Sequence, residues 1–432
     1  MTVPLLRCAG CGTTVTFDGD GPLGGPWACP WRDSGDDIDH VLAPVPSNEG
    51  LLLPRSGSDS PFVRYRHLLA SYRRCRASGG SDDDFVRLVS SLDDAIGVVD
   101  GRGFRITPLV HASGLGAPVW VKDETGNVSG SHKGRHLMGL MLHLLVSGAS
   151  PATPLAIASC GNAALAAAVM ARAAKRELQV YVPLGSASPV VVDRLRSLGA
   201  VVMECPRVAG QTGDPSYSRF RQAVADGAVP FSCQGPDNGL TVDGGATLGW
   251  ELAAQLADAA VQPDRVVVQV GGGALATAVL RGLHDAVDLG VLDRMPVLHV
   301  VQTEGAWPLV RAYEQVAKRI AGGEPAGDAL AHAGTHRSQY MWPWETEPVS
   351  AAGGILDDET YDWLAVVRGL VETGGSPVVV GEAALKAANG LAREATGIDV
   401  DHTGSAGFAG LLELTRRGVV PPDDQVVVFF TG

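Results

Sequence analysis

The chain has 432 residues, and its 34 Lys and Arg against 47 Asp and Glu give a formal net charge of −13. This acidic balance argues against a non-specific nucleic-acid binder and against a protein held on anionic lipid, because both need a basic surface. A hydrophobic content of 45% with 19% charged residues excludes a disordered chain, and the length predicts two to three domains.

The first fifty residues predict a small cysteine knuckle that differs from the rest of the chain. A Cys-x-x-Cys pair, Cys8 and Cys11, is followed by Cys29 and then by His40. Thiolate and imidazole are the ligands that a tetrahedral structural zinc prefers, so residues 1–50 predict a zinc site. The alternative is a set of buried thiols without a metal, because the chain holds no second Cys-x-x-Cys pair to complete the ligand set.

From residue 107 onward, strand and helix patterns alternate. The predicted strands cover 119–121, 155–158, 179–182, 201–204, 265–270, 297–302 and 425–430. The predicted helices begin near Lys133 and then cover 163–175, 190–198, 247–257, 381–395 and 405–415. This alternation predicts an α/β fold, a mostly parallel sheet with helices on both faces.

No segment predicts a membrane span or an export signal. The most apolar stretch, 154–174, contains Ser159, Asn162 and Arg172 and reads as a strand, a turn and a helix. The N-terminus lacks a basic region followed by an apolar run. The seven cysteines are scattered and odd in number, which is typical of a reducing compartment. We therefore expect a cytoplasmic protein without a membrane partner.

Three loops, each between a predicted strand and a predicted helix, contain the candidate catalytic and ligand-binding residues. Such loops are where open α/β sheets bind ligands. The first loop ends in Ser131, His132 and Lys133 at a helix start. The positive end of a helix dipole disfavours a charged ammonium, which suits a lysine that reacts as a neutral amine in a Schiff base. The alternative is an exposed lysine without a chemical role.

The other two loops present backbone N–H groups. Residues 159–163 read Ser-Cys-Gly-Asn-Ala and open a helix whose N-terminus suits a carboxylate. Residues 271–275 read Gly-Gly-Gly-Ala-Leu directly after a β-branched strand, which lets backbone amides close on a phosphate. A tight turn is the alternative for this glycine triplet, which lacks the spacing of a dinucleotide-binding or P-loop motif.

Taken in chain order, these loops and the terminal Val-Val-Val-Phe-Phe-Thr-Gly run resemble the fold type II pyridoxal-phosphate enzymes of the tryptophan synthase β superfamily. The likeness is strongest to the threonine synthase branch. It extends from about Thr107 to Gly432 and includes Asp243 to Glu251, which is similar to a helix start of that family. A cysteine knuckle also precedes the catalytic core in some threonine synthases.

The resemblance implies a tryptophan synthase β-like fold with two open-sheet domains besides the N-terminal Cys knuckle. A large domain that binds pyridoxal phosphate (PLP) would take residues 61–135 and 236–432. A small, mobile substrate domain would take residues 136–235. A homodimer is the expected assembly.

The resemblance also implies roles for individual residues. Lys133 would form the Schiff base and shuttle the α-proton. The cofactor would further contact His132, Asn162 at its 3′-oxygen, the phosphate-binding Gly271, Gly272, Gly273, Ala274 and Leu275, and Thr431 at its pyridine nitrogen. The predicted substrate-binding residues are Ser159, Cys160 and Gly161 for the carboxylate, and Arg135, with Lys122, for a leaving phosphate.

Two departures from the threonine synthase pattern leave alternatives open. His132 stands where Phe is usual, and a His before the Lys is similar to tryptophan synthase β chains, in which it lies near the cofactor phosphate. His132 and His136 are four residues apart, so a metal pair is the alternative. Cys160 replaces the usual Ser or Thr, either as a reactive thiol or as a small residue in a tight loop.

The resemblance implies a PLP-dependent carbon–oxygen lyase or synthase acting on a small amino acid. The leading hypothesis is threonine synthase-like elimination and replacement at the β or γ carbon of a phosphorylated or hydroxylated amino acid. The alternatives are a threonine/serine dehydratase, a cysteine synthase-like β-replacement enzyme, and a non-catalytic PLP-binding or interaction protein. The aromatic run Tyr340 to Glu345 is either packing, including a dimer contact, or a wall of the substrate pocket.

Overall fold

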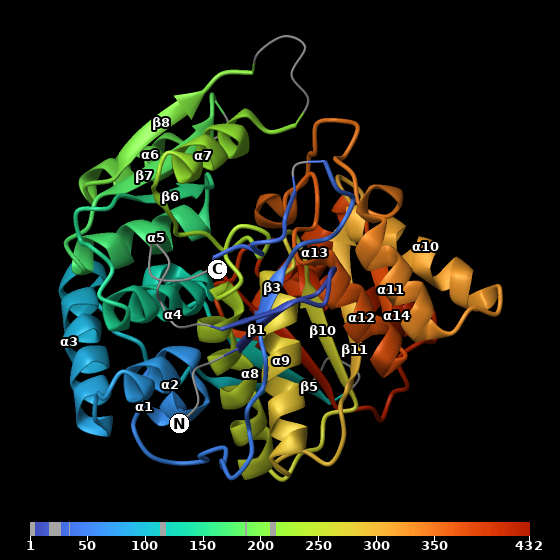
Figure 1. Ribbon diagram of the computed structural model, residues 1–432. Coiled ribbons are helices and arrows are strands. Elements are labelled where there is room, and N and C mark those ends of the chain that lie inside the picture. The colour runs from blue at the N-terminus through green and yellow to red at the C-terminus, as the bar shows by residue number, and fades with distance from the viewer. Residues whose placement is uncertain (1–4, 17–26, 34, 113–117, 186–187, 208–212) are drawn as a thin grey trace.

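A computed structural model describes residues 5–16, 27–33, 35–112, 118–185, 188–207 and 213–432. Residues 1–4, 17–26 and 34 of the predicted knuckle unit therefore lie outside the described part. The described knuckle forms a three-stranded antiparallel sheet in the order β2-β1-β3 (Figure 1). Its strands are β1 (Leu5–Cys8), β2 (Thr14–Thr16) and β3 (Leu42–Pro44).

The larger of the two remaining sheets has six strands in the order β12-β11-β10-β13-β5-β4. All neighbours pair in parallel except the edge strand β4. The strands are β4 (Leu109–Ala112), β5 (Val119–Asp123), β10 (Arg265–Gln269), β11 (Val297–Thr303), β12 (Ser376–Val380) and β13 (Val426–Phe430). The Val-rich runs are buried on both faces, as a parallel sheet between helix layers requires.

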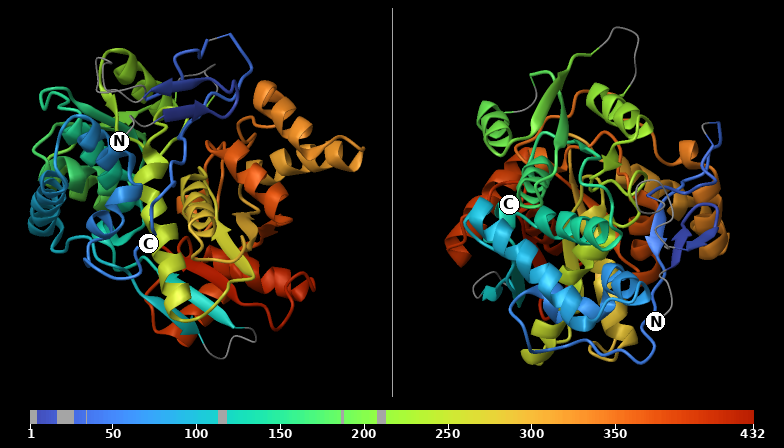
Figure 2. Two further views of the ribbon diagram at one scale, coloured as in Figure 1. Left: turned by 60° about the horizontal axis from the view of Figure 1, so that its bottom comes forward. Right: turned by 60° about the vertical axis from the view of Figure 1, so that its left-hand side comes forward.

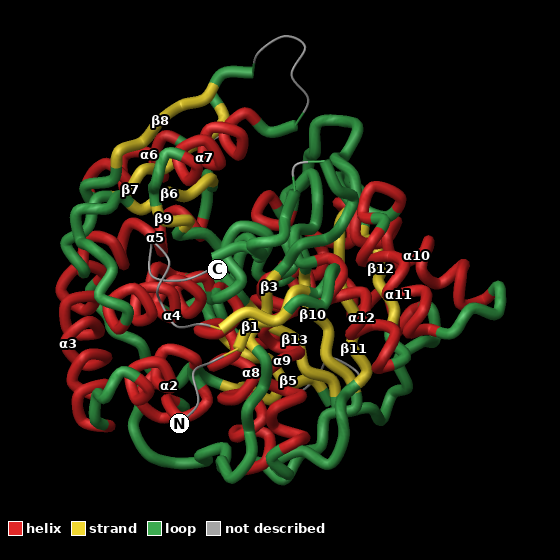
Figure 3. Tube along the Cα trace, in the orientation of Figure 1, coloured by secondary structure: helices red, strands yellow, loops and turns green. Residues whose placement is uncertain are grey.

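The smaller sheet is fully parallel, with the order β8-β7-β6-β9. Its strands are β6 (Leu155–Ala158), β7 (Leu178–Pro183), β8 (Val201–Cys205) and β9 (Val229–Pro230). Figure 3 shows the two sheets as separate groups of strands, with helices between and around them. The predicted α/β architecture with two open sheets is confirmed.

Helices and strands mostly alternate, apart from an all-helical segment before β4, three successive helices between β11 and β12 and two between β12 and β13. They are α1 (Pro61–Arg64), α2 (Ala70–Ala77), α3 (Asp82–Asp100), α4 (Lys133–Val146), α5 (Asn162–Ala173), α6 (Pro189–Ser197), α7 (Pro215–Ala225), α8 (Thr241–Asp258), α9 (Ala274–Asp288), α10 (Pro308–Ala321), α11 (Ala326–Thr335), α12 (Trp363–Thr373), α13 (Glu382–Thr396) and α14 (Ala406–Arg416). Short 3-10 turns occur at Arg66–Leu68, Val128–Gly130, Arg337–Gln339 and Gly353–Ile355. Among the described helices, none has both the length and the apolar character to cross a bilayer.

The core shows how the strands direct their side chains. On β10, Val266 and Val268 belong to one hydrophobic cluster, while Val267 between them belongs to another, which includes residues of α13 and α14. The first cluster continues through α4 and α5 into β6 and β7 of the smaller sheet. Both faces of the larger sheet are therefore buried, and one core joins the two sheets.

Helix α8 lies unusually close to the helix that begins at Lys133. A Cβ on Gly139 of α4 would come within 2.6 Å of the Cα of Gly244 on α8. A methyl group on either glycine would therefore push the two helices apart. This contact fixes α4 against α8.

Candidate active site

Lys133 is the first residue of α4 and follows a sharply turned loop. Ser129 and Gly130 adopt left-handed backbone angles, with φ of 59° and 74°, so the chain reverses before the helix begins. Left-handed backbone at a residue other than glycine is costly and often occurs at functional sites. The half-buried Lys133 amine lies close enough to His132, Asp357 and Asp362 for its charge to shift the pKa of each group.

His132, the residue before Lys133, is buried without a partner. Its side chain is 7% exposed, and neither ring nitrogen has a hydrogen-bond partner among the described residues. Burial, followed by the nearby Lys133 charge, lowers the pKa of His132 well below its usual value. Buried polar atoms are almost always satisfied, so this imidazole indicates a position where a bound group completes the site.

His136 does not complete a metal pair with His132. Its Nδ1 lies 2.8 Å from the carbonyl oxygen of Thr241, and burial lowers its pKa to about 3. The two rings are 5.9 Å apart between centroids. Among the described residues, the metal-type cluster of His, Cys and carboxylate groups is the N-terminal one, so the histidine-pair alternative gains no support.

The glycine loop, Gly271 to Gly273, joins β10 to α9 and already contacts an anionic group. The Asp357 carboxylate lies close enough to the Gly272 N–H for that group to lower its pKa, while burial, the larger effect, raises the pKa of Asp357 to about 6. Gly273 has φ of +97°, which favours glycine. The loop therefore offers amide donors to an anion at the start of α9, as the sequence predicts for a phosphate.

The segment 355–362 packs directly on this loop. A Cβ on Gly271 would come within 2.6 Å of the Asp357 carboxylate, and a Cβ on Gly272 within 3.0 Å of the Tyr361 ring. Burial raises the pKa of Asp362 to about 7, and one of its carboxylate oxygens lacks a hydrogen-bond partner among the described residues. Sequence reasoning missed both carboxylates, because the Asp-Asp-Glu run at 357–359 looks like any solvated acidic turn.

The second loop leads from β6 into α5 and faces the same acidic group. Cys160 is exposed at its surface, yet desolvation, followed by the charges of Asp357 and Asp214, raises the pKa of its thiol. A raised thiol pKa opposes nucleophilic reactivity, which supports the interpretation of Cys160 as a small loop residue. The hydroxyl of Ser159 accepts a hydrogen bond of 3.4 Å from the Gly161 N–H.

Asn162 and Thr431 bring the C-terminal strand to this loop. The Asn162 amide donates to the carbonyl oxygen of Gly432, so the side chain points toward the end of β13. The Thr431 hydroxyl is buried and accepts a 2.9 Å hydrogen bond from the Gln269 amide, which also donates to the carbonyl oxygens of Gly404 and Phe429. Gln269 was not predicted; its position at the end of β10, just before the glycine loop, is the signal that could have indicated it.

Arg135 is the clear error among the predicted site residues. Its guanidinium is 1% exposed and donates to both oxygens of Glu124, at 2.8 Å each, and to both oxygens of Glu251, at 3.0 and 3.1 Å. Lys122 is equally buried and bonds Glu251 at 2.6 Å. Both cations are buried in ion pairs with Glu124 and Glu251, so neither is free to bind a substrate or a leaving phosphate. Helix periodicity alone did not show that Arg135 faces α8.

The knuckle brings its four predicted ligands together. The ligand atoms of Cys8, Cys11, Cys29 and His40 all lie within 4.8 Å of one another. The Nε2 of His40 lies 2.9 Å from the carboxylate of Asp36, a residue that sequence reasoning missed. A carboxylate behind a ligating histidine fixes the ring and its tautomer. Three thiols and one imidazole form the donor set of a structural zinc site.

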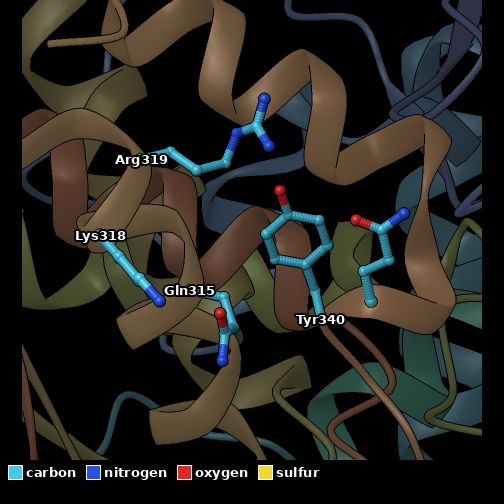
Figure 4. A pocket seen from close by; sticks show the side chains of 5 residues that line it. Gln315, Lys318, Arg319 and Tyr340 are labelled. Atoms are coloured by element: carbon cyan, nitrogen blue, oxygen red, sulfur yellow. The ribbon is translucent and has the colours of Figure 1, made fainter. Parts of the chain in front are cut away.

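The aromatic run at 340–345 packs within the protein rather than against the predicted loops. Arg311 lies over the rings of Trp342 and Trp344, at 4.2 and 4.6 Å from their centroids, and Tyr340 stacks on Trp363. A cavity of about 400 Å³ next to this run is lined by Gln315, Lys318, Arg319, Gln339 and Tyr340 (Figure 4). Tyr340 lines this cavity, but none of the residues predicted in the three loops does, so the cavity is separate from the candidate active site.

A lysine at a helix start beside a glycine loop, between two open parallel sheets, defines a cofactor-dependent α/β enzyme. The chain belongs to the pyridoxal-phosphate dependent enzymes, since the family model of that description matches residues 102–432. The fold is the tryptophan synthase β-like, fold type II one that the resemblance implied. The N-terminal Cys cluster is an addition to the matched region.

Individual relatives carry different reactions. The threonine synthase of Methanosarcina acetivorans is 29% identical over 332 residues, which are 76% of this chain and 74% of that protein. The serine dehydratase-like protein of Mus musculus is 30% identical over 274 residues, 59% of this chain and 77% of that protein. The solved structure of a T.th. threonine deaminase shares the fold with a TM-score of 0.58 at 22% identity, covering 80% of this chain and 97% of that one.

The described residues fit the family's cofactor. The unpartnered His132 ring and the backbone amide of Gly272, which lies beside the Asp357 carboxylate, are donors suited to a phosphate. The charge of Lys133 lowers the pKa of both Asp357 and Asp362, so the lysine lies near these carboxylates. Both carboxylates in turn pack against the glycine loop. Lys133, His132 and the glycine loop are thus the residues that would hold PLP.

Proposed function

We propose that this chain is a PLP-dependent lyase or synthase that eliminates or replaces a group at the β or γ carbon of a small amino acid, with Lys133 as the catalytic residue. The observation that carries the proposal is Lys133 at the start of α4, next to the buried, unpartnered His132 and near groups on the glycine loop. When bound, PLP supplies the electron sink for bond cleavage. The family and the threonine synthase relatives support this reaction class.

The chain's own residues would divide the work as follows. The Lys133 amine takes the proton from the substrate's Cα and returns one after the leaving group departs. The N–H groups of residues 159–161 hold the substrate carboxylate at the start of α5, which orients the Cα–H bond toward Lys133. Gln269 fixes the Thr431 hydroxyl, the group that would face the pyridine nitrogen. A neutral hydroxyl there favours elimination and replacement over decarboxylation.

A phosphorylated substrate, as in threonine synthase-like chemistry, is the first candidate because threonine synthases are prominent among the relatives. A specific observation favours a second candidate, a threonine/serine dehydratase. The cations predicted for a leaving phosphate, Arg135 and Lys122, are buried in ion pairs with Glu124 and Glu251. These two cations are therefore not free to pair with a leaving phosphate, whereas a hydroxyl leaving group needs no such partner.

A substrate panel tests the proposal. We would add phosphohomoserine, phosphoserine, O-acetylserine, threonine and serine to the PLP-loaded protein and follow visible absorbance, phosphate release and keto-acid release. Phosphate release from phosphohomoserine supports the first candidate, and keto acid from threonine or serine alone supports the dehydratase. Turnover of O-acetylserine alone would support a β-replacement enzyme. No absorbance change with any member would contradict the proposal and favour a non-catalytic PLP-binding protein.

We further propose that the knuckle binds one structural zinc through Cys8, Cys11, Cys29 and His40, and elemental analysis of protein made with zinc supplied tests this. The division into a large domain, 61–135 with 236–432, and a small substrate domain, 136–235, is supported by the two separate sheets. The homodimer and the cytoplasmic location stay predictions.

A further inference from the structure

The cysteine knuckle, residues 5–16 and 27–44 where described, is joined to the glycine loop by a continuous set of contacts. We propose that the knuckle is a positioning element of the cofactor site, in which Asp39 and Trp363 hold the segment 357–363 against Gly271 to Gly273. The inference rests on the proposed PLP site and assigns a role to a region outside the matched family residues.

The first step runs from the knuckle to α12. Asp39, the neighbour of His40, is 2% exposed, and its carboxylate accepts a 3.1 Å hydrogen bond from the indole N–H of Trp363, the first residue of α12. The same oxygen lies 3.3 Å from Nε of Arg337, whose NH2 group pairs with Glu359. The backbone N–H of Asp39 also donates to the Gly334 carbonyl oxygen at 2.8 Å. Asp39 of the knuckle therefore fixes Trp363 directly and Glu359 through Arg337.

The second step runs from this segment to the glycine loop. The N–H of Asp362 donates to the carbonyl oxygen of Gly272 at 2.9 Å. A Cβ on Gly273 would come within 3.1 Å of the Asp362 Cβ and 3.2 Å of Thr360. The glycine loop therefore has no room to shift toward the segment 357–363. The position of this segment thus determines the orientation of the loop's peptide planes and of their N–H donors.

A second part of the knuckle, which includes Trp27 and Val41, contacts the chain just before α8. A Cβ on Gly235 would lie between the Asp362 carboxylate, at 2.0 Å, and Val41 of the knuckle, at 3.0 Å. The N–H of Gly239 donates to the Trp27 carbonyl oxygen at 2.9 Å. The blue knuckle strands lie beside the orange helices in both views of Figure 2, in agreement with the hydrogen bond from Asp39 to Gly334 of α11. The knuckle therefore braces the same segment from two sides.

A pair of matched variants tests the proposal in the full chain. Trp363→Phe removes the indole N–H that bonds Asp39 and keeps an aromatic ring. Trp250→Phe is the control, because the buried Trp250 donates an equivalent 2.9 Å hydrogen bond to Asp285 between α8 and α9, away from the knuckle. We would titrate each apoprotein with PLP by absorbance and record the ³¹P NMR signal of the bound phosphate.

The proposal expects Trp363→Phe to raise the PLP dissociation constant about fivefold or more and to shift the ³¹P signal. Trp250→Phe should lower the unfolding temperature by a similar amount while leaving both cofactor readouts unchanged. An unchanged dissociation constant in Trp363→Phe, or equal increases in the two variants, would overturn the proposal. If Trp363→Phe does not fold, Glu359→Gln, which weakens the pairing with Arg337, must raise the dissociation constant, and no change there overturns it.

Metal release gives an independent readout. Coupling between two sites is reciprocal in binding free energy, so PLP should lower the dissociation constant of the knuckle for zinc, measured by equilibrium competition with a chromogenic chelator, and Trp363→Phe should reduce this effect. An equal zinc dissociation constant with and without PLP would contradict the coupling. A wild-type chain that binds no PLP would overturn the proposed function itself, whereas a PLP-binding chain with unaffected variants overturns only the positioning role.

Discussion

Two neighbouring residues at the start of α4, Arg135 and His132, are both buried, yet they have opposite surroundings. Arg135 donates to two carboxylates that are themselves fully buried, Glu124 and Glu251. His132 has no partner for either nitrogen among the described residues. A satisfied buried charge stabilises the fold, whereas an unsatisfied buried polar group marks a place for a ligand. Within one helical turn, Arg135 with Glu124 and Glu251 thus forms a structural centre, and His132 belongs to a binding centre.

The largest expected effect comes from breaking the structural centre. Glu251→Gln removes the charge that Arg135 and Lys122 share, and these interactions hold the pKa of Glu251 down to about 2. We expect a loss of about 3–5 kcal/mol in the free energy of unfolding, measured by urea denaturation.

Glu413→Gln is the matched control, because Glu413 also pairs with two arginines, Arg416 and Arg417, but on the surface. This variant should barely change the denaturation midpoint. Equal effects of the two substitutions would show that burial does not set the strength of the Arg135 network.

The second effect concerns pH and the carboxylate beside the glycine loop. Burial raises the pKa of Asp362 from 3.8 to about 7, so the folded apoprotein binds a proton that the unfolded chain releases between these values. The stability that this group contributes is therefore present below pH 4 and is lost as the pH rises to about 7. Asp362→Asn should be more stable than wild type at pH 8 by roughly 2–4 kcal/mol, and the difference should vanish near pH 4.

Urea denaturation of the apoprotein from pH 4 to pH 8 measures this difference directly. A constant gap between wild type and Asp362→Asn across that range would contradict the raised pKa. A gap of the opposite sign at pH 8 would show that the ionised carboxylate is stabilised by the Lys133 ammonium, whose charge acts on it.

The smallest expected effect on stability comes from the binding centre. His132→Asn removes an imidazole that donates to nothing described in the apoprotein, so the free energy of unfolding should change by less than about 1 kcal/mol. The PLP dissociation constant should rise about tenfold, because a buried donor to the phosphate is lost. Calorimetry of the apoprotein and PLP titration measure the two quantities. A large stability loss with unchanged PLP affinity would place His132 with Arg135 as a structural residue.

Many strands and several helices of the matched region were predictable from the sequence, because buried Val runs and helical spacing are local signals. The strand at 155–158 is confirmed residue for residue, and the helix predicted at 163–175 is Asn162–Ala173. The helix predicted at 247–257 begins earlier, at Thr241, because its first turns contain glycines that pack against α4. The strand Ser376–Val380 and the helices Pro215–Ala225, Pro308–Ala321, Ala326–Thr335 and Trp363–Thr373 were not predicted.

The site was predictable where residues are consecutive and not where the fold brings distant segments together. The loops containing Lys133 and Gly271 carry recognisable local patterns. Asp357 and Asp362 reach the glycine loop from almost ninety residues away, and Glu251 reaches Arg135 from 116 residues away. Such pairings depend on tertiary packing, so a charged residue next to a motif, such as Arg135, was mistaken for part of the binding surface.

The central claim is that Lys133 is the residue that binds PLP covalently. Borohydride reduction of the PLP-loaded protein, followed by proteolysis and mass spectrometry, locates the modified lysine. The account predicts the adduct on the peptide that contains Lys133, and Lys133→Ala should lose both this adduct and the visible absorbance band. An adduct on another lysine, or an adduct that persists in Lys133→Ala, would contradict it.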